Sequence, residues 1–254
     1  MAQSFSLLLS LSGAARRRVT IVALCAIAGL VAMNFLAYAL RDRLPAGVPA
    51  VALQKFLLDG EQNVPTWFSS MLLFTTAQLL CVIGITAHAQ QRRFAWHWLA
   101  LAGIFAFMSM DEVSAFHELL IVPVREWLHL GGVFYFAWVL PAMVLCAILA
   151  IIYLPLVRSL PAQFRWGVVL AGAIYLAGAI GMELIGGAIA DSYGLPNFAY
   201  FLSTTIEETL ELLGIVGFIH VLIWQVSQPS AETASAVEPP SERVRPYSHP
   251  RKSN

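Results

Sequence analysis

Seven carboxylates lie inside apolar stretches of this sequence that contain no lysine or arginine. Placing one carboxylate near the centre of a bilayer costs about 2.5 to 3.5 kcal/mol on insertion scales, so seven are hard to retain without a function. The seven are Asp111, Glu112, Glu118, Glu183, Glu207, Glu208 and Glu211. Inside a membrane such groups must be protonated, hydrated or neutralised by a cation.

Carboxylates combined with an imidazole are typical ligands of Mn, Fe, Ca or Mg, whereas structural zinc favours cysteine and histidine. Di-iron centres in helix bundles combine glutamates with Glu-x-x-His motifs. Glu208-x-x-Glu211 and His117-Glu118 are a partial match to that pattern. We therefore predict a divalent metal, with Fe, Mn, Ca, Mg and Zn not distinguished. The predicted ligands are Asp111, His117, Glu118, Glu183, Glu207, Glu208 and Glu211.

Buried acids of this kind are also compatible with two roles that need no fixed metal. They can form a proton or cation pathway, as chains of acidic residues do in pumps and transporters. They can also be protonated groups that hydrogen-bond neighbouring helices and so have a structural role. The metal site is the preferred hypothesis.

Helical spacing indicates which of these groups can meet. At 100° per residue, Asp111, Ser114, His117 and Glu118 share an arc of about 120°, whereas Glu112 points elsewhere. We therefore predict that Ser114 lies beside the site and that Glu112 belongs to a second shell around the ligands.

Stretch 198–226 carries a polar stripe on an otherwise apolar helix, with an arc of about 140°. The stripe consists of Tyr200, Ser203, Thr204, Glu207, Glu208, Glu211 and Gly214. Tyr200 and Thr204 are predicted to support the ligands. In stretch 166–190, Glu183 shares a face with small residues that let helices approach closely. These are Gly172, Ala179, Gly186, Gly187 and Ala190, with Leu176 as the one large member.

The segment LDGEQNVPTWFSS precedes another apolar stretch. Asp59, Glu61 and Asn63 alternate in it, and Pro65-Thr66 is typical of a helix start. These three residues are expected to form a solvated turn or, alternatively, a lid or ligand source for the site below, because alternating oxygen ligands resemble the start of a calcium loop.

The elements that position these groups follow from composition. The chain has 254 residues, of which 59% are apolar and 12% charged, and its mean hydropathy is +0.73. These values do not fit a water-soluble globular domain. A helix of about 20 apolar residues is about 30 Å long, which is enough to cross the hydrocarbon core of a bilayer. The apolar stretches of this sequence predict an all-α, polytopic transmembrane helix bundle of about six spans, at 19–40, 66–89, 94–118, 133–157, 166–190 and 198–226.

Lysine and arginine are unevenly divided between the loops. With both termini inside, eleven basic residues fall on the inner side and four on the outer side. The positive-inside rule therefore predicts cytoplasmic termini. Asp111, Glu183 and Glu207 then lie ~10 to 15 Å below the outer boundary, which predicts a single site that opens outward.

Three regions are expected along the chain. These are a cytoplasmic N-terminal segment at 1–18, a six-helix transmembrane domain at 19–226, and a disordered cytoplasmic tail at 227–254 that is rich in proline, serine and charge. The formal net charge of zero gives no sign of a nucleic-acid partner. Membrane lipid is the one partner that the sequence indicates, and protein partners are not predicted.

Four blocks occur in order along the chain: LDGEQNVPTWFSS, SMDEVSAFHE, MELIGG and TTIEETLELLG. Together they resemble a group of uncharacterised bacterial six-helix integral membrane proteins with DExxxxHE, MELxGG and EExxE motifs, some of which are loosely labelled as transporters. The resemblance implies a bacterial inner-membrane location. It implies no activity.

We predict from these features a buried carboxylate and histidine cation site in the outer half of the bundle. The preferred function is a metal-dependent membrane enzyme, a hydrolase or an oxidoreductase, that acts on a lipid or other hydrophobic substrate. The alternative is a proton- or divalent-cation-coupled transporter, which requires the site to open inward as well. The mostly apolar run from Gly214 to Ile219 below Glu211 favours the enzyme.

Overall fold

The structure is a computed structural model that describes residues 13–45 and 47–227. The expectations for residues 1–12 and for the tail at 228–254 lie outside the described residues. Within the described part the chain is helical and has no β-strand. The elements are α2 (Gly13–Leu40), α3 (Val48–Gln54), α4 (Val64–Ala89), α5 (Ala95–Ser114), η1 (His117–Leu120), α6 (Ile121–Leu128), η2 (Gly132–Phe134), α7 (Val139–Ser159), α8 (Ala162–Leu176), η3 (Ala177–Met182), α9 (Glu183–Tyr193) and α10 (Phe198–Val226).

Five helical segments are long and apolar enough to cross a membrane, by length and composition. They are α2, α4, α7, the continuous stretch Ala162–Tyr193 that joins α8, η3 and α9, and α10. Counting α5 with the segment His117–Leu128, a pair bent by 77°, as one span gives six. The predicted all-α, polytopic transmembrane bundle of about six spans is confirmed.

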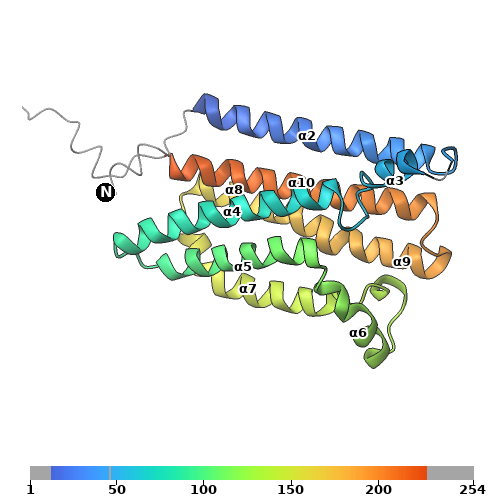
Figure 1. Ribbon diagram of the computed structural model, residues 1–254. Helices are drawn as coiled ribbons and strands as arrows, with labels where there is room; N and C mark the ends of the chain where they lie inside the picture. Colours follow the sequence, from blue (N-terminus) through green and yellow to red (C-terminus); the bar gives the residue numbers. More distant parts are fainter. Residues whose placement is uncertain (1–12, 46, 228–254) are drawn as a thin grey trace, which may run out of the picture.

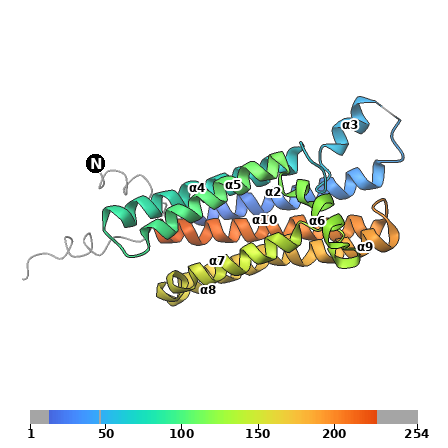
Figure 2. The same cartoon turned by 90° about the horizontal axis from the view of Figure 1, so that it is seen from below.

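The long helices lie side by side along one axis, with α10 in contact with α2, α4, α8, η3 and α9 (Figures 1 and 2). One end of the bundle carries α3, α6 and the turn between α9 and α10. We call it the α3/α6 end. The opposite end carries the α4–α5 and α7–α8 turns, the start of α2 and the end of α10. Both ends of the described chain therefore lie at the same end of the bundle.

The half of the bundle away from the α3/α6 end has an apolar core. Leu80, Phe164 and Leu222 are fully buried in it, each with 0% exposure. Further along α10 toward the α3/α6 end, Ile215 and Ile219 pack with Leu73 of α4. These side chains are shielded from both water and lipid by the neighbouring helices. Their close packing stabilises the contacts between those helices.

Helices α4 and α10 start in the same way. Asn63 caps α4, since its side-chain oxygen accepts from the backbone N–H of Thr66 at 2.9 Å, and its amide donates to the carbonyl oxygen of Gly60. Asn197 caps α10 in the same manner and donates to the carbonyl oxygen of Gly194. In each Gly-x-x-Asn turn the asparagine thus satisfies one of the free N–H groups at the helix start.

Helix α5 ends at Ser114, four residues before the predicted end of that span. Ala115 has a positive φ of 49° and ends the helix in the left-handed conformation. The side chain of Asp111 accepts the backbone N–H of His117, which stabilises the bend that follows. His117 and Glu118 therefore do not continue the helical face of Asp111, and the predicted arc over these residues is wrong.

The π-helix η3 changes the face that α8 presents. A π-turn holds one more residue than an α-turn, so side chains before it rotate relative to those after it. Gly172 and Leu176, predicted on the face of Glu183, are exposed, whereas Gly178 and Ala179 are buried with Gly186. A Cβ atom on Gly178 would lie 2.7 Å from the carbonyl oxygen of Glu207, so η3 and α10 are in backbone contact there.

Asn34 of α2 ties the loop before α4 to the bundle. Its side chain is 1% exposed, accepts the backbone N–H of Leu58 at 3.0 Å and donates to the hydroxyl of Thr205 at 2.8 Å. One amide therefore connects α2, α10 and the loop that carries Asp59.

We expect Asn34→Ala to loosen this loop and to destabilise the protein. The backbone N–H of Leu58 is left buried without an acceptor, a loss of about 1 to 3 kcal/mol. Limited proteolysis should cut the segment 41–63 faster, and the thermal midpoint in detergent should fall. Gln54→Ala, at an exposed site in α3, is the matched control. Equal proteolysis of both variants would contradict the role of Asn34.

Candidate cation site

The acids that were predicted from the sequence come together in the half of the bundle nearest α3 and α6 (Figures 1 and 2). Helix α5 supplies acids from its last turn, α9 begins with one, and α10 supplies three from its first half. These are Asp111, Glu112, Glu183, Glu207, Glu208 and Glu211. Their charges are close enough to interact across the three helices.

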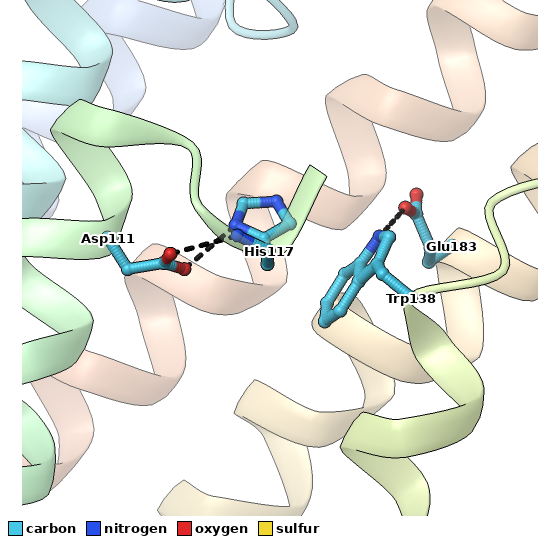
Figure 3. Close-up of polar contacts among 4 residues, drawn as sticks. All are labelled: Asp111, His117, Trp138 and Glu183. Atoms are coloured by element: carbon cyan, nitrogen blue, oxygen red, sulfur yellow. Dashed lines mark hydrogen bonds and ion pairs between the residues drawn. The ribbon is translucent and has the colours of Figure 1, made fainter. Parts of the chain in front are cut away.

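Asp111 and Glu183 take part in one row of contacts (Figure 3). Oδ2 of Asp111 lies 2.8 Å from Nδ1 of His117, and Oδ1 accepts the His117 backbone N–H at 3.0 Å. The ring of His117 lies against the indole of Trp138, with 4.6 Å between centroids. Nε1 of Trp138 donates to Oε1 of Glu183 at 2.6 Å. His117 and Glu183 are therefore joined through a single tryptophan.

Glu207 is the most deeply buried acid among the described residues, with 8% exposure. Its carboxylate lies beside that of Glu183. No N–H or hydroxyl group of the described residues donates to Oε2 of Glu207, although the Glu207 carboxyl group can share a proton with that of Glu183. Oγ of Ser203, one turn earlier and 3% exposed, has no hydrogen-bond partner. Buried polar atoms are nearly always partnered, and leaving one unpaired costs about 1 to 3 kcal/mol. Ser203 and Glu207 thus present two polar atoms on one face of α10 that are available to water or to a ligand.

Glu112 faces the bundle interior, contrary to the prediction that it points elsewhere. Its carboxylate lies beside the hydroxyl of Ser69 and interacts with Glu208 and Glu211, and Glu211 lies beside the hydroxyl of Tyr175. The inward face of α5 is shared by Trp98, Ala102, Phe105, Ser109 and Glu112. The rotation of α5 about its own axis therefore directs Glu112, and not Ser114, toward the bundle interior.

Asp59, Glu61, Glu118 and Tyr200 form a second polar group toward the α3/α6 end. The hydroxyl of Tyr200 lies beside Asp59, and Glu61 lies beside Glu118. Asp59 keeps part of its surface open to solvent. Desolvation by the surrounding protein, together with the negative charges of Glu183 and Glu118, raises its pKa to about 7. Asp59 is an exposed residue at the mouth of the acidic group, between it and solvent. The solvated turn and the lid both stay predictions.

Three predicted supporting residues have other roles in the structure. Ser114 is exposed at the end of α5. Asn63 uses its side chain to cap α4. Thr204 is buried, but its hydroxyl donates to the carbonyl oxygen of Phe201 at 3.2 Å. None of the three is directed by these contacts toward the carboxylates.

The carboxylates have no lysine or arginine partner in the part of the chain that the structure describes. The ion pairs of the described residues join Arg41 with Asp42 and His117 with Asp111. Within the same residues, no three His, Cys, Asp or Glu side chains converge as a ready-made metal-ligand group. The acids form neighbouring pairs, so a shared cation requires their side chains to turn toward one another.

The site is closed on the side away from α3 and α6. Below Glu211, the α10 side chains of Leu212, Ile215 and Val216 are 1 to 3% exposed. They pack against α2 and α4, and no polar side chain interrupts α10 from Leu212 to Ile219. This part of α10 therefore offers water and ions no polar route to the acids.

Sequence reasoning missed Trp138 and Tyr175 as site residues. Trp138 precedes α7 in an aromatic run, FYFAW, that gives no sign of a polar partner. Tyr175 is a lone polar group in an apolar segment, and that was the available signal. Their roles depend on contacts with Glu183, Glu211 and Glu112 on other helices.

A family profile described as "Domain of unknown function (DUF8692)" matches residues 18–226, which include every described site residue. The chain belongs to the DUF8692 family. No curated protein and no solved structure matches the chain. The matched region of this DUF8692 member runs from Arg18, in the first turns of α2, to Val226 at the end of α10.

Proposed function

We propose that this DUF8692 protein binds a divalent cation in its buried acidic site and acts as a metal-dependent membrane enzyme. The observation that supports it best is the Glu207 carboxyl group, which is buried, lies against the Glu183 carboxyl group, and has an oxygen, Oε2, that no N–H or hydroxyl group of the described residues reaches. Glu183 and Glu211 lie close to Glu207, and the described chain places no lysine or arginine beside them. A divalent cation offsets this negative charge and uses oxygen ligands.

The one-sided access supports an enzyme over a transporter. Alternating access requires a path from the site to both sides of the membrane. Here the layer around Leu212 and Ile215 closes one side. A metal in such a site would activate water or dioxygen. The carboxylates and His117 would hold it, and the described residues leave Fe, Mn, Ca, Mg and Zn as candidates.

A lipid or other hydrophobic substrate is supported by an apolar groove near the site. The groove has a volume of about 300 Å³ and lies between α2, the segment after α3, and α4. Met33, Phe56, Trp67 and Phe68 line it. Phe68 precedes Ser69, whose hydroxyl lies beside Glu112, so an acyl chain in this groove would lie one helix away from the acids.

The proposed location is the bacterial inner membrane, with the basic end of the bundle toward the cytoplasm. Arg16, Arg17 and Arg18 lie in the first turns of α2, and Arg92 and Arg93 lie in the α4–α5 turn at the same end. By the positive-inside rule this end is cytoplasmic, and the α3/α6 end then faces the periplasm.

Elemental analysis of the detergent-purified protein tests the proposal. The protein is purified anaerobically, supplemented with Fe, Mn or Zn salts, and desalted. We expect a stoichiometric metal in the wild type and its loss in Glu183→Gln. Glu126→Gln, which removes an exposed carboxylate from α6, should keep the metal. A metal-free wild type after supplementation would overturn the proposed function.

A second candidate function, a proton-coupled transporter, is supported by one contact. The carboxyl groups of Glu183 and Glu207 lie side by side in the bundle, an arrangement that favours one shared proton. Proteoliposomes with an internal pH-sensitive dye test it. Proton flux that Glu207→Gln abolishes would support the transporter, and flux equal to that of empty liposomes would exclude it.

Cation binding should strengthen as the pH rises through about 7, because Asp59 at the mouth loses its proton there. The folded pKa of about 7 lies above the unfolded value of 3.8. Between pH 3.8 and about 7, Asp59 therefore holds a proton in the metal-free folded state that it has lost in the unfolded state. The contribution of Asp59 to the free energy of unfolding is consequently lost as the pH rises through this range. Mn²⁺ titrations on both sides of pH 7 measure the effect. Asp59→Asn should flatten it, and an unchanged profile would contradict this role.

A further inference from the structure

The segment after α5 leaves the direction of the long helices. Ala115 ends α5 in the left-handed conformation, and His117–Leu128 continues at 77° to Ala95–Ser114. Helix α6 lies beyond the end of α5 and across the long helices (Figures 1 and 2). Its eight residues are about 12 Å long, far short of the ~30 Å of a hydrocarbon core. Because α5 runs with the spanning helices, α6 runs along the membrane surface.

Apolar side chains cover the side of this segment that faces away from the protein. Leu119 is 68% exposed and Trp127 is 79% exposed. The one basic side chain of α6, Arg125, turns back to the bundle. Its Nη1 donates to the carbonyl oxygen of Tyr135 at 3.3 Å, and its guanidinium lies 4.7 Å from the centroid of the Tyr135 ring. A helix at a surface in water directs its charged side chains outward, so this arrangement indicates apolar surroundings on the outer side.

The exposed apolar surface continues from α5 onto η1. Met110 and Val113 are exposed on α5, Phe116 is exposed at the bend, and Leu119 follows in η1. The other side of α5 packs on α4. Exposed apolar side chains on a membrane-spanning helix face lipid. The surface that meets lipid along α5 therefore extends through Phe116 to Leu119.

The polar and apolar sides of α6 separate at two adjacent residues. At 100° per residue, Pro123 and Trp127 lie about 40° apart, whereas Glu126 lies about 100° from Trp127. Tryptophan is enriched at membrane interfaces, because its ring is apolar and its N–H takes a polar partner. With Pro123 and Trp127 turned to lipid, the exposed carboxylate of Glu126 turns to the headgroups and water.

We infer that η1 and α6 form an interfacial helix whose partner is the lipid leaflet at the α3/α6 end, contacted by Leu119, Leu120, Pro123 and Trp127. The inference rests on the transmembrane fold and is independent of the proposed cation site. The bend after α5 then places Glu118, whose side chain is exposed, at the depth of the lipid headgroups.

Spin labels on single cysteines test the lipid contact in the full-length protein. The protein is placed in nanodiscs of phosphatidylethanolamine and phosphatidylglycerol, after alanine has replaced Cys25, Cys81 and Cys146. A label at Trp127→Cys should collide with oxygen several-fold more than with an aqueous nickel complex, as a label at Ile151→Cys, exposed in the middle of α7, does. A label at Glu126→Cys should favour the nickel complex, as one at the exposed Gln90→Cys of the α4–α5 turn does.

Two results of this measurement would overturn the inference. A Trp127→Cys label as open to the nickel complex as the Gln90→Cys label would place α6 in water. A Trp127→Cys label protected from both reagents would mean that protein, such as a second copy of the chain, covers this surface. Either result would leave the proposed cation site untouched.

Tryptophan fluorescence gives an independent measurement that keeps the native cysteines. The emission lost in Trp127→Phe is obtained by difference, in vesicles of the same lipids with and without brominated acyl chains. We expect brominated chains to quench most of this emission and aqueous iodide to quench little of it. Trp98→Phe is the matched control, because Trp98 is buried in the bundle core and neither quencher should reach it. Quenching of the Trp127 emission by iodide alone would contradict the lipid contact.

Discussion

Glu207→Gln is expected to make the metal-free protein more stable while it abolishes cation binding. The substitution keeps the size of the side chain and replaces the carboxyl group beside Glu183, Glu208 and Glu211 by a neutral amide. The new amide can donate to the Glu183 carboxylate, so the pair no longer needs a shared proton. Relief of this crowding of acidic groups should stabilise the apo protein by about 1 to 3 kcal/mol.

Two measurements on the same preparation separate the effects. For a domain of this size, about 1 kcal/mol corresponds to a rise of 2–4 °C in thermal midpoint. The affinity for Mn²⁺ should fall by more than about 100-fold, beyond the range for an outer-shell group. Glu126→Gln, exposed on α6, should change neither value. A lower midpoint with Mn²⁺ binding intact would show that Glu207 has a structural role.

The second large effect is expected at Gly178, where η3 meets α10. A Cβ atom there would lie 2.7 Å from the carbonyl oxygen of Glu207, 3.0 Å from Cγ of Glu211 and 3.1 Å from its backbone nitrogen. Two of these are backbone atoms that cannot rotate away. We expect Gly178→Ala to separate the helices, to destabilise the protein by about 1 to 3 kcal/mol as overpacking does, and to displace Glu183 from Glu207.

Gly172→Ala is the matched control because it makes the same change six residues earlier, where nothing lies within 4 Å of the added Cβ atom. Alanine is the better helix former by about 0.8 to 1 kcal/mol, so this variant should be as stable as the wild type or slightly more stable. Thermal unfolding in detergent compares the two variants. Equal midpoints would mean that η3 yields easily and that the close contact is not needed.

These two variants address different requirements of the site. Glu207 provides charge, and its removal should lower cation affinity without harming the fold. Gly178 provides proximity, and its substitution should harm both. The contrast follows from their contacts, since the Glu207 side chain meets the Glu183 carboxyl group whereas Gly178 touches the α10 backbone.

The sequence alone determined the helices and the set of acids. Apolar stretches such as those of α7 and α10 are long enough to span a bilayer. Transfer of a carboxylate into the bilayer with such a stretch is costly, which singles out the acids inside them. Helix bundles satisfy all backbone hydrogen bonds within each segment, so their presence follows from local composition. The grouping of Glu207, Glu208 and Glu211 on α10 also followed, because helical periodicity fixes angles within one helix.

The tertiary structure decided which residues meet between helices. Periodicity does not fix the rotation of a helix against its neighbours, so the inward direction of Glu112 depends on how α5 packs on α4. The π-helix η3 is a local change of register that moves Gly178, in place of Gly172, onto α10.

The bend after Ser114 and the pairing of Trp138 with Glu183 have the same origin. Asp111 ends its helix by bonding His117, and Trp138 reaches an acid 45 residues further along the chain. Such contacts form only after the helices have packed, because they join groups whose separation is set by the whole bundle. The sequence therefore determined which charges enter the membrane, and the packing of α5, η3 and α10 determined which of them face one another.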